Sequence, residues 1–331
     1  MRMRRCPAVV FAGCGKAEIR QVIVPSITDE EILVRSICTG ISVGTERWYL
    51  TGKVKGVAER YPLIPGYQRI GIVEEAGSAV QTFKPGDRVW LGAWAMRLDP
   101  SDGLSGGGSH SQYAVAHHSR ALPVPATVAT EEAALATLAA VGLMGLEMTP
   151  SKLDDLAVVI GQGIVGLMAA QLARLMGAYV VTSDLIERRV ALSRKYCADL
   201  AINASTENLA DAVHQLTPDG ADLVIDTSGN SKLFSYDVGL LRRPGKLCLQ
   251  GYFPEPIQVD FHDTHWKRTT VSFPMGFDMD GVKRAFRLLE RERITISPLI
   301  THRIKSDNAL EAYRLLAERP DEIVGMVLVW E

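Results

Sequence analysis

The most constraining feature of this 331-residue sequence is a run of three glycines that directly follows a short apolar strand. Residues 157–160 read AVVI, and Gly161, Gly163 and Gly166 follow in the spacing G-x-G-x-x-G at the start of an apolar helical segment. A lone motif of this kind is weak evidence, but this one stands between a strand and a helix, as a dinucleotide-binding βαβ unit requires. The first glycine allows a tight turn, the second lets the backbone approach a pyrophosphate, and the third lets helix and strand pack closely.

An acidic residue stands where the second strand of such a unit ends. The segment YVVTSD ends in Asp184, at the distance from the glycines where a carboxylate binds the adenosine ribose hydroxyls. We expect the amides at the start of the helix, around Ile164 and Val165, to face the phosphates. A carboxylate repels a 2′-phosphate and so favours NAD over NADP, whereas Arg188 and Arg189 could accommodate that phosphate. A helix-capping aspartate with solvated arginines is the alternative interpretation.

The pattern of apolar residues changes near the middle of the chain. Up to about residue 125, short β-branched runs such as EEILVRSI and DRVWLG, separated by glycine, proline and aspartate, predict a compact barrel or sandwich. From about residue 153, strands and amphipathic helices alternate, which predicts a parallel sheet covered on both faces. Two domains of roughly 150 residues each are expected for a chain of this length.

Composition excludes several classes of partner. The net charge is −2 and the sequence pI is about 6.4, without a basic stripe, which argues against nucleic acid or an anionic membrane as the main partner. The five cysteines are scattered, so reduced thiols and a cytoplasmic location fit best. The basic, apolar start superficially suggests a signal peptide, but PAVVFAGCGKAEIRQV reads better as strand, turn and strand. No apolar stretch is long enough and free enough of charge for membrane insertion.

A β-rich first half joined to a dinucleotide-binding fold resembles the medium-chain dehydrogenase/reductase superfamily. The similarity covers essentially the whole chain and includes VVFAGCGKAEI, PGYQRIGIVEEAG and KPGDRV. It implies an α/β protein with a GroES-like β-barrel catalytic domain, residues 1–141 plus 275–331, and a Rossmann domain with a doubly wound parallel sheet, residues 142–274. The resemblance also implies further cofactor-binding residues: Arg189, Thr227, Ser228, Gly251 and Tyr252.

The zinc ligands of that superfamily are replaced in this chain. Zinc members have a cysteine in G-x-C-G-T-D, a histidine in G-H-E and another cysteine ahead of the cofactor domain. Here GISVGTE has Val43, PGYQRIG has Tyr67 and Gln68, and the third position falls near Thr137. Valine cannot ligate zinc, and tyrosine and threonine are poor substitutes for imidazole and thiolate. Residues 92–112 also lack the four cysteines of a structural zinc site, so we expect an enzyme without metal.

Several phrases are most similar to the bacteriochlorophyllide dehydrogenases, which oxidise a 1-hydroxyethyl substituent to an acetyl group. They include GISVGTERWYLTG, YPLIPGYQRIG and GYFPEPIQVDF. That family more often has Gly-Tyr-Glu where this chain has Gln68, and the glycine fingerprint is more complete here. The resemblance therefore implies a secondary alcohol that is ring-bearing, sugar-like or a hydroxyethyl tetrapyrrole.

Without zinc, a side chain must handle the hydroxyl proton. The resemblance places four candidates near the nicotinamide. Tyr67 could act as phenolate base or phenol acid, or could simply fill the space vacated by the metal. Thr45 could relay a proton. Glu46 is either a base or the buried partner of an arginine. His110, in a loop that faces substrate in the family, suits acid–base chemistry, although a loop histidine is more often solvated.

The expected reaction is the NAD-dependent, zinc-independent oxidation of a small-molecule secondary alcohol to a ketone. Aromatic residues that could line the substrate pocket are Trp48, Trp90, Trp94 and Tyr252. One alternative is an NAD(P)H-dependent quinone or enone reductase, against which Asp184 counts, and another is a catalytically silent nucleotide-binding protein. Superfamily members pair through edge strands, and TTVSFP is a candidate edge, so a homodimer or homotetramer is expected.

Overall fold

The structure is a computed structural model that describes residues 4–92 and 95–330. The chain forms two compact units, the first from residues 1–137 and 296–331 and the second from residues 138–295. The first boundary lies earlier in the chain than the expected division after residue 141, and the second lies later than the expected division after residue 274. The difference arises because the helix α8 (Met279–Glu290) packs within the second unit, where a Cβ on Gly281 would lie 3.3 Å from the Cβ of Ala140.

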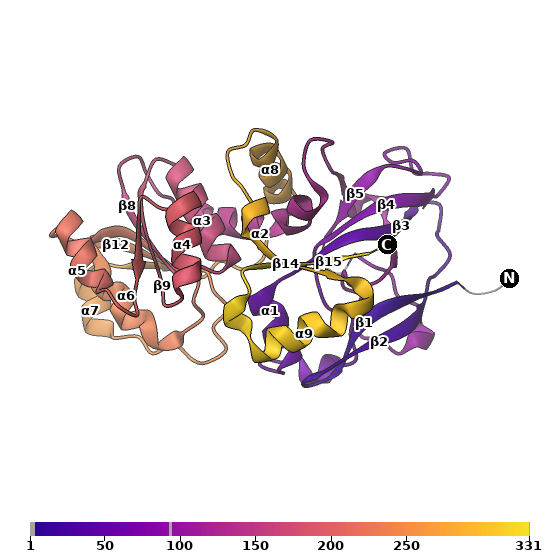
Figure 1. The fold of residues 1–331 in the computed structure, drawn as a ribbon, viewed down its shortest axis with the longest axis horizontal. Coiled ribbons are helices and arrows are strands. Elements are labelled where there is room, and N and C mark those ends of the chain that lie inside the picture. The colour runs from indigo at the N-terminus through magenta and orange to yellow at the C-terminus, as the bar shows by residue number, and fades with distance from the viewer. Residues whose placement is uncertain (1–3, 93–94, 331) are drawn as a thin grey trace. The chain divides into compact units, whose positions relative to one another are not determined.

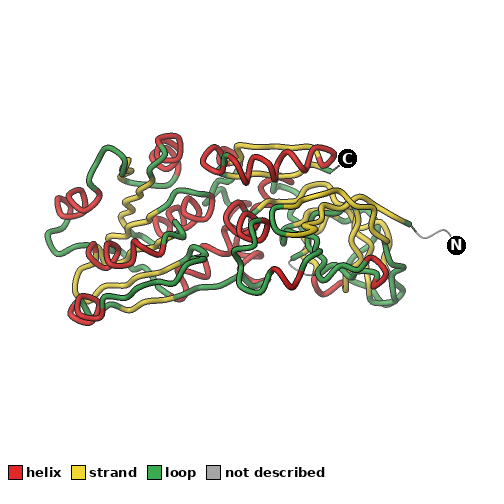
Figure 2. The backbone as a smooth tube through the Cα atoms, turned by 90° about the horizontal axis from the view of Figure 1, so that it is seen from below, coloured by secondary structure: helices red, strands yellow, loops and turns green. Residues whose placement is uncertain are grey.

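The first unit is mainly antiparallel β structure. An antiparallel pair of strands opens the chain, as the strand–turn–strand pattern predicts: β1 (Arg5–Gly13) and β2 (Lys16–Ile23). A curled sheet follows, with the order β14-β15-β3-β4-β5-β7 and β6 paired to β3 (Figures 1 and 2). Its strands are β3 (Glu31–Ile41), β4 (Arg69–Ala76), β5 (Arg88–Leu91), β6 (Tyr113–His117), β7 (Ala121–Pro123), β14 (Ile300–Lys305) and β15 (Gly325–Val329).

Two helices of the first unit come from opposite ends of the sequence. Figure 1 shows α9 (Ala309–Glu318), in yellow, beside α1 (Val43–Leu50), in indigo. The buried face of α9 contributes Ala312, Tyr313 and Leu316 to a core that also contains Phe11 of β1. The last strand, β15, pairs antiparallel with β3 in the same unit. Residues from both ends of the chain therefore share one hydrophobic core.

The second unit is built on a six-stranded sheet in which every pair is parallel, with the order β10-β9-β8-β11-β12-β13. Its strands are β8 (Leu156–Ile160), β9 (Tyr179–Asp184), β10 (Leu200–Asn203), β11 (Ala221–Asp226), β12 (Leu241–Leu249) and β13 (Thr270–Ser272). Besides α8, its helices are α3 (Ile164–Leu175), α4 (Glu187–Tyr196), α5 (Leu209–Leu216), α6 (Phe234–Leu240) and α7 (Phe261–Trp266), while α2 (Thr130–Met148) runs through the boundary. The predicted α/β class and parallel sheet are confirmed.

The chain order of this sheet contains a switch point beside β8. The strand order reverses on either side of β8, and ligands of doubly wound sheets bind at such a switch point. All five residues of β8 are buried, which explains the uninterrupted apolar run LAVVI. The strand β13 is an outermost strand of this sheet, as we expected for the TTVSFP segment. Pairing of this strand between copies of the chain stays a prediction.

All five cysteines are free thiols, and four of them are buried. None of the helices in residues 4–92 and 95–330 combines the length and hydrophobicity that crossing a bilayer requires.

Two buried aspartates lie behind the turn that follows β11. Asp226 ends this strand and Asp237 lies in α6, and both side chains are fully buried. The Ser228 N–H donates to Oδ1 of Asp226 at 2.6 Å, whereas Oδ2 of Asp226 and both carboxyl oxygens of Asp237 lack a donor among the described residues. Burial raises the pKa of both carboxyls, and the neighbouring Asp226 raises that of Asp237 further. The pair therefore shares a proton that the unfolded chain would release.

Replacing Asp237 by asparagine should make the stability of the protein less dependent on pH. A carboxyl whose pKa is raised on folding contributes its full stabilisation below the unfolded pKa of about 4 and loses it as pH rises toward the folded pKa. The wild-type protein should lose up to about 1.4 kcal/mol per pH unit in this window, and D237N should lose less. Urea unfolding from about pH 5 to about pH 9 measures both slopes. The exposed Asp219→Asn serves as the control, and parallel slopes for wild type and D237N would contradict the shared proton.

Candidate functional site

The three glycines of the fingerprint have different structural roles. Gly161 has a φ of +84°, which disfavours any residue with a Cβ. A Cβ on Gly166 would lie 1.9 Å from the carbonyl oxygen of Gly161, so this glycine lets α3 pack against the end of β8. A Cβ on Gly163 would meet nothing within 4 Å, and this residue is the N-cap of α3. The open space at Gly163 and the helix amides behind it fit a phosphate group.

The turns after β11 and β12 hold this loop in place. Thr227 donates its hydroxyl to the Gly161 carbonyl at 2.8 Å, and its N–H donates to Ile160 O at 2.9 Å. The N–H of Gly251 donates to the Asp226 carbonyl at 3.0 Å, and a Cβ on Gly251 would crowd Gly229 N at 2.9 Å. The structure therefore brings the predicted residues Thr227, Ser228 and Gly251 to the same carboxyl edge as the glycines.

Asp184 connects the glycine loop to the end of the second strand. Its Oδ2 accepts the Gln162 N–H at 2.6 Å, and its Oδ1 accepts the Ile186 N–H at 2.9 Å. The Nη1 atom of Arg189 lies 3.8 Å from Oδ2, and the Arg189 side chain is only 16% exposed. The N-cap of α4 is Ile186, so the alternative of a capping aspartate with solvated arginines is wrong for Asp184 and Arg189. The neighbouring Arg188 is exposed.

In the first unit, Tyr67 lies against the start of α1. Its side chain is partly exposed, and its hydroxyl is hydrogen-bonded to the side chains of Ser42, the N-cap residue, and Thr45 in the first turn. Burial of the ring among protein atoms raises the pKa of Tyr67 to about 12, and the charge of Glu46 adds to this increase. The pKa moves away from the value that a phenolate base requires, so Tyr67 is a neutral phenol at pH 7.

His110 and Glu46 form a pair beneath this surface. Both are buried, with 0% and 2% of the side chain exposed, and His110 Nε2 lies 3.1 Å from Glu46 Oε2. The expectation that His110 faces substrate or solvent is wrong, because the ring is enclosed by the barrel. The expected arginine partner of Glu46 is also wrong: its carboxylate accepts the Ser42 N–H at 2.8 Å and the Tyr313 O–H at 2.8 Å.

A buried arginine fixes the loop that carries His110, and sequence reasoning missed it. Arg69 donates from Nη2 to the Ser109 carbonyl at 2.7 Å and to the Ser111 hydroxyl at 2.6 Å. Burial lowers the pKa of this guanidinium to about 10, which still leaves it charged at neutral pH. The signal was an arginine directly before the apolar run IGIV in the strand β4.

Comparison with known proteins agrees with this architecture. The model for the alcohol dehydrogenase GroES-like domain matches residues 28–126, and the model for zinc-binding dehydrogenases matches residues 165–291. An alcohol dehydrogenase from Moraxella sp. is 30% identical, over 80% of this chain and 82% of the relative. The chain belongs to the alcohol dehydrogenase family. It is therefore an oxidoreductase that acts on CH–OH groups with a nicotinamide cofactor.

Other relatives of this chain are named for different substrates. D-xylulose reductase of Saccharomyces cerevisiae is 25% identical over 95% of this chain and 94% of the relative. The 2-desacetyl-2-hydroxyethyl bacteriochlorophyllide A dehydrogenase of Cereibacter sphaeroides is 28% identical over 98% of both chains. An Escherichia coli oxidoreductase of unknown specificity has the same fold, with a TM-score of 0.89, 21% identity and coverage of 99% of this chain and 100% of that chain. The superfamily resemblance is confirmed, while the identities do not single out one substrate.

The residues at the expected positions of the catalytic zinc ligands do not fit a zinc ion. Val43 has no donor atom, and Tyr67 is a neutral phenol engaged with two hydroxyls. Thr137 is fully buried, and its hydroxyl accepts the Trp90 Nε1–H at 3.0 Å. Both amide atoms of the buried Gln68 lack a partner among the described residues. No group of three or more His, Cys, Asp or Glu side chains in the described part of the chain could hold a metal.

The predicted pocket aromatics have different surroundings. Trp48 is partly exposed, and the Arg47 guanidinium and the Lys53 ammonium lie 5.2 and 5.1 Å from its ring. Trp90 is buried and belongs to the core, so its predicted role in a pocket is wrong. Tyr252 is 42% exposed on the second unit. The prediction for Trp94 lies outside the described residues.

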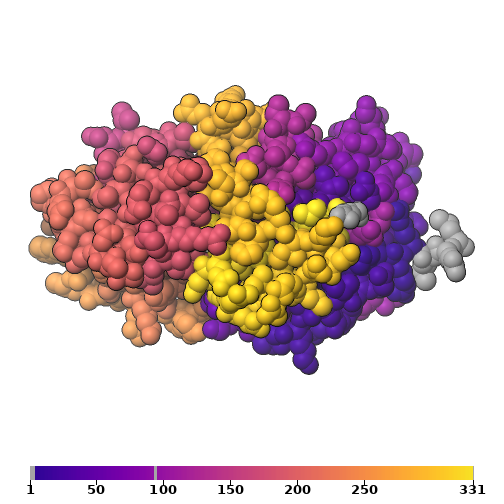
Figure 3. Space-filling model, in the orientation of Figure 1, coloured from indigo at the N-terminus to yellow at the C-terminus, as the bar shows by residue number. Residues whose placement is uncertain are grey.

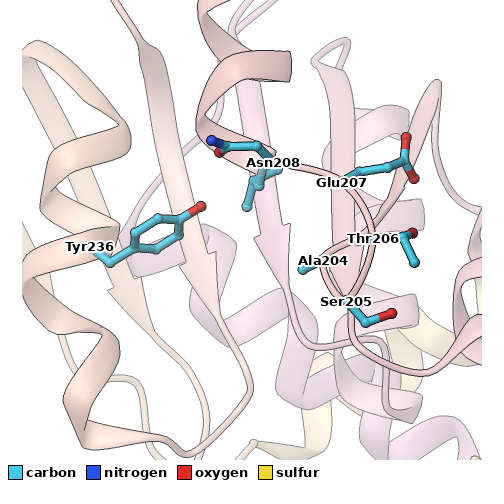
Figure 4. A pocket seen from close by; sticks show the side chains of 7 residues that line it. Ala204, Ser205, Thr206, Glu207, Asn208 and Tyr236 are labelled. Carbon is cyan, nitrogen blue, oxygen red and sulfur yellow. The ribbon is translucent and has the colours of Figure 1, made fainter.

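The second unit also has an open polar pocket of about 460 Å³ at the carboxyl end of β10. Figure 4 shows Tyr236 on one side and the segment that leads into α5 on the other. Its lining residues are Ala204, Ser205, Thr206, Glu207, Asn208, Leu209 and Tyr236. None of the predicted site residues lines this pocket, although the Ala204 N–H donates to the Asp184 carbonyl at 3.0 Å.

Alanine at Gly163 and at Gly166 should separate cofactor binding from folding. Gly163 has an ordinary φ of −68° and open space, so G163A should keep the stability of wild type but weaken NADH binding about tenfold or more by occupying the phosphate approach. G166A should lose about 1–3 kcal/mol of stability, because its Cβ would meet a backbone oxygen. Titration of NADH fluorescence and thermal unfolding measure the two effects. Unchanged NADH affinity in a folded G163A protein would count against this phosphate site.

Proposed function

We propose that this enzyme interconverts a secondary alcohol and its ketone with NAD, and that Tyr67 rather than zinc handles the proton of the reacting oxygen. The observation that carries the proposal is the phenol of Tyr67, a half-buried residue at an expected zinc-ligand position, which is hydrogen-bonded to Ser42 and Thr45. The predicted dinucleotide-binding residues belong to the second unit, and Tyr67 belongs to the first unit.

The protonation state of Tyr67 determines its role in each direction. When bound, the nicotinamide dinucleotide donates or accepts the hydride. In ketone reduction, Tyr67 gives its phenolic proton to the carbonyl oxygen as that oxygen becomes a hydroxyl. In alcohol oxidation, the phenolate takes that proton from the hydroxyl. Because the pKa of Tyr67 is about 12, the phenol is ready for reduction at neutral pH, whereas only about one phenolate in 10⁵ is available for oxidation.

Thr45 supports Tyr67 without acting as a base. Thr45 is a half-buried residue whose side chain is hydrogen-bonded to Tyr67, so we assign it the transfer of a proton between the phenol and water. Glu46 and His110 are too buried to touch a substrate. We therefore assign acid–base chemistry to Tyr67, proton relay to Thr45, and a supporting role to the buried pair.

The proposed cofactor is NAD because the Asp184 carboxylate lies at the end of β9. Arg189 faces Asp184, and its charge is partly neutralised by this carboxylate rather than directed at a 2′-phosphate. The alternative, a quinone or enone reductase, would favour NADPH, so the ratio of kcat/KM for the two nucleotides distinguishes these functions. The proposed substrates are ring-bearing, polyol-like or hydroxyethyl-bearing secondary alcohols, in agreement with the activities named for the relatives.

Removing the Tyr67 hydroxyl should abolish most of the activity in both directions. Y67F should lower kcat at least about 100-fold, because a positioned acid contributes about 10²–10⁴ to the rate. In the wild-type enzyme, the rate of alcohol oxidation should rise about tenfold per pH unit as the phenolate fraction grows. The rate of ketone reduction should stay constant up to about pH 10, because Tyr67 keeps its proton there. Steady-state kinetics over this range measure both profiles. A Y67F enzyme with the wild-type kcat would refute the role of the phenol.

Removal of metal should leave turnover unchanged. The purified enzyme should contain substoichiometric zinc, and incubation with a strong chelator should not lower kcat, because the residues at the expected ligand positions are poor zinc donors. Elemental analysis and assays before and after chelation measure this. A relative that keeps its zinc ligands provides the positive control. Loss of activity that is restored by one equivalent of zinc would overturn the zinc-independent mechanism.

A further inference from the structure

The buried carboxylate of Glu46 reaches the start of α1, where Tyr67 is held. Its Oε1 accepts the Ser42 N–H at 2.8 Å. The side chain of the same Ser42 is hydrogen-bonded to the Tyr67 phenol. One residue thus binds Glu46 through its backbone and Tyr67 through its side chain, so a shift of the Glu46 carboxylate moves the hydrogen-bond partner of the phenol.

A second connection runs through the ring of His110 to the backbone just before Tyr67. A Cβ on Gly66 would lie 2.4 Å from His110 Nε2, so the imidazole packs directly against this glycine. Gly66 has a φ of +89°, which only glycine adopts readily. The same ring atom lies 3.1 Å from Glu46 Oε2. The position of the Glu46–His110 pair therefore determines where the turn at Gly66 and Tyr67 can rest.

Two residues near the C-terminus, Tyr313 and Trp330, complete the hydrogen-bond network around Glu46 and His110. Tyr313, in α9, donates its O–H to Glu46 Oε2 at 2.8 Å, and Trp330 donates its Nε1–H to Thr39 Oγ1 at 2.9 Å. Thr39 Oγ1 lies 2.8 Å from His110 Nδ1. One assignment of protons satisfies every atom: Thr39 donates to Nδ1, and Nε2–H of neutral His110 donates to an ionised Glu46.

We propose that Tyr313 is a positioning residue for Tyr67, acting through the Glu46 carboxylate on both Ser42 and His110. The inference rests on the proposed function of Tyr67. Tyr313 is 1% exposed and cannot touch a substrate, whereas the neighbouring Arg314 is exposed. Figure 3 shows the yellow C-terminal segment that contains α9 on the surface of the protein. The Tyr313 hydroxyl is one of three donors to the buried Glu46 carboxylate, beside Ser42 and His110. A carboxylate that loses one donor shifts toward the donors that remain.

Tyr313→Phe tests this role, because it removes only the hydroxyl and keeps the ring that packs against Phe11 at a centroid distance of 5.0 Å. We expect kcat to fall about tenfold, the size expected for one hydrogen bond to a charged group, with the KM for NAD unchanged. We also expect faster amide hydrogen exchange in the segment 64–71 of the substrate-free protein.

Tyr61→Phe is the matched control, since it removes a tyrosine hydroxyl that donates to the Tyr49 carbonyl in the same unit but outside the network. It should leave kcat and exchange in segment 64–71 at wild-type values. If Y313F does not fold, Thr39→Val tests the same network from its other end, with the same expected results. Wild-type kcat and exchange in folded Y313F would overturn the proposal. An enzyme that turns over no alcohol or ketone would refute the proposed function, while the exchange measurement would still decide whether Tyr313 positions the Tyr67 turn.

Discussion

A buried carboxylate must find donors, and this requirement at Glu46 organises the first unit. Isolated ionised groups are too costly to bury, so Glu46 takes an N–H from the start of α1, a phenol from α9 and the imidazole of His110. These donors come from three segments, of which the most distant lies 267 residues away in sequence. The hydrogen bonds hold α9 and the loop that carries His110 around the turn that contains Tyr67.

In the second unit, buried carboxylates likewise accept backbone N–H groups around the glycine loop after β8. Asp184 accepts the N–H of Gln162 between the first two glycines, and Asp226 accepts the N–H of Ser228 in the turn that Thr227 ties to Gly161. A hydrogen bond to a charged acceptor is roughly twice as strong as a neutral one, so these acids can hold irregular backbone against its conformational entropy. The Asp226–Asp237 pair differs because its two carboxyls share too few donors and must retain a proton.

Local patterns predicted the parts of the molecule whose physics is local. The G-x-G-x-x-G run, the strand AVVI and Asp184 lie within 30 residues of one another, and their geometry follows from turn and packing rules. The burial of His110 and the donors of Glu46 could not be predicted, because Tyr313 and Trp330 reach the site only through the return of the last segment to the first unit. The resemblance to a family also misled, since the loop that it led us to expect beside the substrate is enclosed here by Arg69 and its serine partners.

In the proposed mechanism, replacement of the zinc ligands changes which direction of the reaction the protein assists. A metal ion acidifies a bound alcohol and so serves oxidation at neutral pH, whereas a phenol with a raised pKa is a proton donor and serves reduction. The buried charge of Glu46 contributes to this choice, because it keeps the proton on Tyr67 while it holds Ser42 in place to orient the phenol. The same carboxylate thus fixes the geometry of the acid and opposes its ionisation. A variant that oxidises efficiently at neutral pH would have to lose this charge or gain a different base, and loss of the charge would leave Tyr313, His110 and the Ser42 N–H without their common acceptor.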